Sequence, residues 1–113
     1  MTTTLTRSDH MSRHETMKPK FDSGQILATP GALDAIKASG QAPEVFLGAH
    51  LEGFWGSELD EEDRLLNEEA LIDGSRLLSA YSTLRGVKVW VLTEAADEDG
   101  RRASTTINLA PEY

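Results

Sequence analysis

The sequence predicts an α+β domain in which helices are followed by a three-stranded antiparallel meander. Helix starts and stops are concentrated before Gly74, whereas apolar side chains alternate with period two after it. With 113 residues, of which 39% are hydrophobic, the chain has room for one core of modest size. Because the helical and strand patterns are segregated along the chain, they favour α+β architecture over a doubly wound α/β fold.

Three helices are predicted from their terminal residues. The first lies between Thr29-Pro30 and Gly40, the second between Pro43 and Gly53, and the third between Asp60 and Gly74. Thr29 and Asp60 can each accept a hydrogen bond from a backbone N–H of the first turn, and proline has the φ angle of a first helical position. The glycines can end a helix in the left-handed conformation. The first two helices have a very short link and are expected to form an αα-hairpin. The side chains of the second helix that are available for burial are Val45, Phe46 and Ala49.

Four short segments have strand patterns. The first, Gln25–Ala28, is an apolar run before the first helix, so one short N-terminal strand can precede the helices. Residues 75–83 and 87–93 alternate on either side of a tight connection, and residues 103–109 alternate again after the charged turn. These last three segments are expected to form the meander. The side chains expected to face the helices are Val87, Val89, Val91 and Ile107.

Residues 1–20 have almost no large apolar side chains, so we expect a disordered tail followed by a single domain at residues 21–113. Either Met1 or Met17 can be the first residue of the protein. The chain has no cysteine, which excludes disulfides, a thiol nucleophile and a cysteine-ligated metal and fits a reducing compartment. It has neither a secretory signal nor an apolar run of about 20 residues. We therefore expect a cytoplasmic protein that does not enter a membrane.

The predicted domain is strongly acidic. The tail has four basic and two acidic residues, so residues 21–113 carry seven basic and seventeen acidic groups. Such a field repels nucleic acid and attracts basic surfaces, including those of proteins that bind nucleic acid. The alternative is that the charge serves solubility alone.

The acidic residues are densest between Glu52 and Asp73, where nine carboxylates accompany the single Arg64. Within the third predicted helix, acidic residues recur seven apart and so form two ridges. Evenly spaced carboxylates can imitate a phosphate backbone. Two aromatic residues between glycines precede this helix and are expected either to plug the core or to contact a partner. The candidate partner-binding residues are Phe54, Trp55, Glu58, Asp60, Glu61, Glu62, Glu68 and Glu69.

The main alternative is a small RNA-cleaving or toxin-like enzyme that uses the antiparallel sheet. Arginine, tyrosine and glutamate side chains on one concave face could bind and cleave RNA, and residues 76–106 are similar in pattern to the barnase-like ribonucleases. The candidate catalytic residues of such an enzyme are Arg76, Tyr81, Glu94 and Arg101, with Lys88 and Arg102 beside them. A regulator that works through homodimerisation is a third class that the sequence leaves open.

No metal or cofactor is expected. The three histidines, His10, His14 and His50, are not accompanied by a recognisable set of ligands. The chain also has no glycine-rich phosphate loop and no Gly-x-Ser-x-Gly motif.

Three segments carry a resemblance to a protein group. They are residues 76–81 (RLLSAY), 86–95 (GVKVWVLTEA) and 105–113 (TTINLAPEY), and residues 28–33 (ATPGAL) add to them. Over roughly Phe21 to Tyr113 the chain resembles small plasmid and integrative-element proteins of proteobacteria that are often labelled type I restriction subunit or plasmid-related protein. The loop Ala96–Arg102 is longer than in that group. The resemblance implies an accessory gene of mobile DNA, such as an anti-restriction or anti-CRISPR inhibitor.

Overall fold

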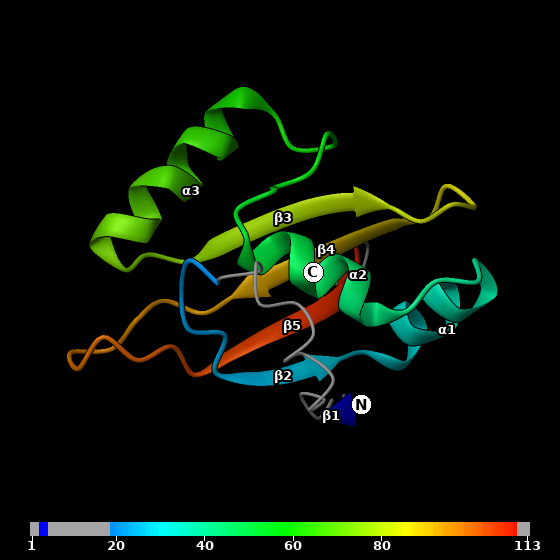
Figure 1. Cartoon of the computed structure of the whole chain (residues 1–113), viewed down its shortest axis with the longest axis horizontal. Coiled ribbons are helices and arrows are strands. Elements are labelled where there is room, and N and C mark those ends of the chain that lie inside the picture. Colours follow the sequence, from blue (N-terminus) through cyan, green and yellow to red (C-terminus); the bar gives the residue numbers. More distant parts are fainter. Residues whose placement is uncertain (1–2, 5–18, 111–113) are drawn as a thin grey trace.

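Three helices and one mixed β-sheet form the part of the chain that the structure, a computed structural model, describes: residues 3–4 and 19–110. The predicted α+β class is confirmed (Figure 1). Of the predicted tail, residues 1–2 and 5–18 lie outside the described residues, as do both candidate start residues. The elements are, in chain order, β1 (Thr3–Thr4), β2 (Gln25–Ala28), α1 (Pro30–Ala38), α2 (Pro43–Leu51), α3 (Glu61–Asp73), β3 (Leu77–Ser82), β4 (Lys88–Thr93) and β5 (Ser104–Leu109).

The sheet has the strand order β1-β2-β5-β4-β3. β3, β4 and β5 are antiparallel neighbours, with Ser79 opposite Val91 and Val91 opposite Ile107. The predicted meander is therefore present, but it is only part of the sheet. β2 lies beside β5 and runs parallel to it, with Ile26 opposite Thr105. The long chain between these two strands, which contains all three helices, allows the parallel pairing that a tight turn could not make.

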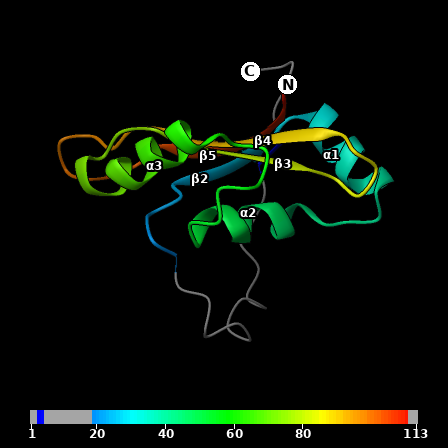
Figure 2. The same cartoon turned by 90° about the horizontal axis from the view of Figure 1, so that it is seen from above.

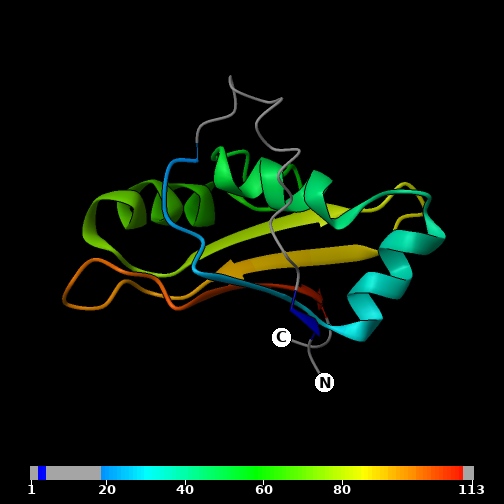
Figure 3. The ribbon, with the colours of Figure 1, turned by 60° about the horizontal axis from the view of Figure 1, so that its bottom comes forward.

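The helices occupy different sides of the sheet. α2 lies across one face, whereas α3 lies beside the edge strand β3 (Figures 1 and 2). α1 and α2 follow one another along the sheet instead of lying side by side, so the predicted αα-hairpin does not form (Figure 3). Within the described residues, no helix is both long enough and apolar enough to cross a membrane.

All three helices start where the sequence predicts, and two of them have a side-chain cap. The Thr29 hydroxyl accepts a hydrogen bond from Ala32 N at 3.2 Å, and the Asp60 carboxylate accepts one from Asp63 N at 2.8 Å. α3 ends at Gly74, whose φ of 83° favours glycine because a Cβ is strained there. These caps determine where α3 begins and ends beside the sheet.

The main core lies between the sheet and α1 and α2. Val89, Val91 and Ile107 face the helices and are fully buried, as predicted. Two predicted core positions are wrong. Val87 is 37% exposed because it precedes the first paired residue of β4, and Val45 of α2 faces solvent. The helical side chains in this core are Ala32, Ile36, Phe46, Leu47 and Leu51.

The outer edge of β3 is closed by polar groups from outside the sheet. The Asn67 amide of α3 donates to Leu78 O at 2.6 Å, and its oxygen accepts from Leu78 N at 3.0 Å. Ala80 N donates to Trp55 O at 3.0 Å. Gly56 makes this approach possible, since a Cβ there would lie 1.9 Å from Ala80 O. A side chain and a loop thus bond three of the backbone groups on the outer edge of β3.

We expect Asn67→Leu to lower the free energy of unfolding by about 2–4 kcal/mol, because two backbone groups of Leu78 lose their partner. The matched control is Asn108→Leu. Asn108 is also buried, but its Oδ1 has no hydrogen-bond partner within the described residues and its Nδ2 makes a long bond of 3.4 Å to Thr106 O. This change should therefore cost less than about 1 kcal/mol. Urea denaturation of both variants tests the comparison. Equal losses would contradict the role of Asn67 at the edge.

Candidate functional site

The exposed side of α3 combines carboxylates with apolar side chains. Successive helical residues are about 100° apart, so Glu61 and Glu68 form one ridge, and Glu62 and Glu69 form a second. All four are exposed, as the predicted ridges require. Between the ridges lie two apolar side chains that are also exposed, Leu65 at 58% and Ile72 at 90%. We call these two residues the α3 stripe.

Within the part of the chain that the structure describes, no basic side chain forms an ion pair with the carboxylates of the ridges. Arg64, the single basic residue of α3, uses its guanidinium on the carbonyl oxygens of Leu59, at 3.2 Å, and Gly56. Among the described residues, the one ion pair joins Lys88 to Glu58 at 3.4 Å, outside α3. The exposed side of α3 is therefore an acidic surface with an apolar centre.

Three predicted partner-binding carboxylates also have structural partners. Asp60 caps α3, Glu58 pairs with Lys88, and Glu68 accepts a hydrogen bond from Trp55 Nε1 at 2.7 Å. Because Asp60 uses one oxygen on the cap and Glu68 is exposed on the helix, both can still contribute charge to the surface.

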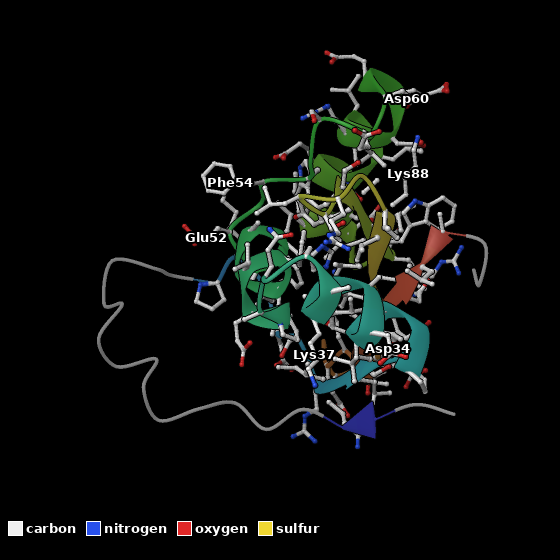
Figure 4. The ribbon with its side chains drawn as sticks, turned by 90° about the vertical axis from the view of Figure 1, so that its right-hand side faces the viewer. Asp34, Lys37, Glu52, Phe54, Asp60 and Lys88 are labelled. Carbon is white, nitrogen blue, oxygen red and sulfur yellow. The ribbon has the colours of Figure 1, made fainter. Side chains whose placement is uncertain are left out.

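The two aromatic candidates separate. Trp55 is only 3% exposed and packs with Leu59 and Leu77, so it plugs the core and its ring is not available to a partner. Phe54 is 64% exposed and points away from the body of the domain, on the side of Glu52 and far from Asp60 at the start of α3 (Figure 4). Neither ring lies on the exposed side of α3. Trp55 is therefore unavailable to a partner because it is buried, whereas Phe54 is exposed away from α3 and stays a predicted contact outside the acidic helix.

A groove of about 460 Å³ lies between α3 and the face of the sheet that is turned away from α2. Its lining combines acidic residues of α3 with apolar residues of the sheet. The lining residues are Asp63, Leu66, Asn67, Glu69, Asp73, Ser75, Arg76, Leu78, Leu92 and Ala95. We call it the α3 groove.

The residues of the enzymatic alternative do not come together. Tyr81 faces α2, and its hydroxyl donates to Phe54 O, while burial raises its pKa to about 12. Arg76 lines the α3 groove five residues before Tyr81, which is roughly 16 Å along an extended chain. Glu94 follows β4, and Arg101 is exposed in the turn before β5. Arg76 and Tyr81 therefore lie on opposite faces of the sheet, so the four side chains do not share one concave face.

The two flanking cations of that alternative are also occupied. Arg102 is buried and donates to the carbonyl oxygens of Ser75, Glu94 and Ala70 at 2.8, 2.9 and 3.1 Å. Lys88 is held by Glu58, as described above. Arg102 therefore ties the turn before β5 to the end of α3 and to the start of β3, which is a structural role.

A buried polar network surrounds His50, which the sequence pattern did not indicate. Its Nδ1 lies 2.5 Å from Ser79 Oγ, and its Nε2 lies 2.8 Å from Thr93 Oγ1. Thr93 Oγ1 lies 2.7 Å from Thr105 Oγ1, which donates to Ser23 O at 2.8 Å. The signal in the sequence is three hydroxyl residues at inward positions of strands that are otherwise apolar.

His50 is fully buried and lies edge-on to the rings of Phe21 and Trp55. Burial, and secondly the positive charge of Arg102, lowers its pKa to about 3. The imidazole is therefore neutral at physiological pH and connects α2 to the sheet. Among the described residues, no group of three side chains could hold a metal ion.

Fold and surface together describe a small α+β domain whose most distinctive exposed feature is an acidic helix with an apolar centre. No family model matches the chain, and no curated protein or solved structure is significantly similar to it. The resemblance to mobile-element proteins therefore stays a prediction.

Proposed function

We propose that this chain is a non-enzymatic binding protein that docks α3 onto a basic surface of a protein that binds nucleic acid. The observation that carries the proposal is the arrangement of two acidic ridges, without an ion pair among the described residues, on either side of the exposed α3 stripe. Protein interfaces combine an apolar centre with a polar rim, and Leu65 and Ile72 supply such a centre. The ridges supply electrostatic complementarity to a basic partner.

Solubility alone explains the charge but not the apolar residues. An Ile72 side chain that is 90% exposed between carboxylates adds nothing to solubility and is not part of the core. The spacing of the ridges supports competition with a phosphate backbone for the partner's surface. We therefore propose a cytoplasmic role as an accessory protein of a mobile genetic element, namely an inhibitor of host restriction or CRISPR defence.

The test is capture of proteins from a bacterial lysate by the parent chain and by a variant with Glu61, Glu62, Glu68 and Glu69 all changed to Gln. We expect the captured proteins to be basic and to be displaced by added duplex DNA, and the variant to bind at least about tenfold more weakly. Glutamine at position 68 keeps an acceptor for Trp55 Nε1, so the fold should survive.

The matched control changes four exposed carboxylates elsewhere, Asp34→Asn, Glu44→Gln, Glu98→Gln and Asp99→Asn. It alters net charge equally and should bind within about twofold of the parent, once salt screens distant charges over about 8–10 Å. If the control loses as much binding as the α3 variant, only total charge matters and the proposal is wrong. Displacement by salt but not by DNA would contradict competition for a nucleic-acid surface.

A further inference from the structure

The α3 groove has an apolar floor. Leu78 of β3 and Leu92 of β4 are directly opposite in the sheet register, so their side chains lie together on the face turned away from α2. Leu66, which is 56% exposed, adds an apolar wall from α3. This surface would suit an aliphatic chain.

The rim of the same groove is acidic. Asp63, Glu69 and Asp73 provide three carboxylates, against the single guanidinium of Arg76. Asp73 accepts a hydrogen bond from Ser75 N at 2.8 Å, and hydrogen bonds from Ser75 lower the pKa of its carboxyl group. It also stands in the last turn of α3, which contains no basic residue, although the helix dipole favours cations there. The end of the groove therefore keeps a negative charge that helix stability does not explain.

We infer that the α3 groove receives one lysine or arginine side chain of the partner. These side chains combine an aliphatic stem with a charged head, so the stem would lie on Leu78 and Leu92 and the head would reach the carboxylates of the rim. Glu69 belongs both to the groove and to an acidic ridge, so the groove continues the proposed interface. The inference rests on the proposed function, because it names what the basic partner inserts beside α3.

The test is a titration of the ¹⁵N-labelled protein with acetyl-Gly-Lys-Gly-amide and its arginine counterpart, followed by NMR. Two further peptides separate the parts of the ligand: norleucine keeps the stem without the charge, and 2,3-diaminopropionate keeps the charge without the stem. We expect shift changes centred on the amides of Asn67, Leu78 and Leu92 with lysine and arginine. Both of these peptides should bind about tenfold more weakly, because norleucine lacks the charge that the acidic rim attracts and diaminopropionate lacks the methylenes whose burial is worth at least that factor.

A groove variant, Asp63→Asn, Leu66→Ala and Asp73→Asn, should abolish these shift changes. The control Asp34→Asn with Glu98→Gln makes the same change in charge away from the groove and should retain them. Shift changes that spread over all acidic surfaces, or a diaminopropionate peptide that binds as well as lysine, would overturn the inference.

Lysate capture separates this inference from the proposed function. For that purpose Glu61→Gln with Glu68→Gln alters only the ridge that is remote from the groove. If the ridge variant loses the partner and the groove variant keeps it, the groove inference fails and the proposed function stands. If the peptides occupy the groove but neither variant affects capture, α3 is not the docking surface and both fail. We expect both variants to weaken capture.

Discussion

Val89→Asp is expected to unfold the domain. Val89 is fully buried between the sheet and the helices, where a carboxylate would have neither water nor a partner. Such a burial costs several kcal/mol, which is comparable to the total stability of about 5–15 kcal/mol of a small domain. Circular dichroism and thermal melting of the purified variant measure this directly, and we expect no cooperative transition.

Val87→Asp is the matched control, because Val87 has the same parity in sequence but is 37% exposed in the turn before β4. We expect its free energy of unfolding to stay within about 1 kcal/mol of the parent. A Val89→Asp protein that melts cooperatively would mean that β4 presents its other face to the helices.

Acidification is expected to destabilise the domain through His50. The pKa of this residue is about 3 in the folded chain and near 6.5 in the unfolded chain, so between these values only the unfolded state binds the proton. The stabilisation is complete above pH 6.5 and is lost as the pH falls toward 3, by about 1.4 kcal/mol per pH unit. At pH 4.5 the loss should be about 3 kcal/mol.

His50→Gln isolates this contribution from that of the many carboxylates. A glutamine amide can both donate and accept, so it can retain bonds to Ser79 and Thr93, but it does not titrate. Urea denaturation between pH 7 and pH 4.5 should therefore give a shallower slope for the variant than for the parent. Identical slopes would contradict the buried neutral state of His50.

Local signals predicted the elements well because each is caused by neighbouring residues. Thr29 with Pro30 and Asp60 mark helix starts through bonds that lie within the first turn. The alternation of apolar residues in β4 correctly indicates one buried face. The apolar pattern also includes Val87, which is exposed because strand pairing begins only at the next residue. Sequence pattern indicates a strand but not its first paired residue.

Long-range choices could not be predicted in this way. Ile26 identifies β2 as an apolar strand, but nothing in four residues states that β5 is its parallel neighbour. In the sequence, Trp55 is compatible both with burial in the core and with contact to a partner. Only its packing against Leu77 in the folded structure shows that it is buried.

The exposed side of α3 could not be predicted from the sequence for a similar reason. Its apolar residues surround much of the helix, and the side that packs on the sheet contains Asn67 and Ala70 while Leu65 and Ile72 remain outside. The sequence therefore predicts the acidic ridges, but the stripe between them and the groove beside them come from tertiary structure.

The closed edge of β3 limits how other molecules can attach. A strand from another chain needs free N–H and C=O groups in a row, and those of Leu78 and the N–H of Ala80 are already bonded to Asn67 and Trp55. A binding partner cannot extend the sheet by β-strand addition there, and growth of fibrils from that edge is blocked in the same way. Recognition on this side of the molecule therefore depends on side chains, where single substitutions can tune affinity without altering the backbone.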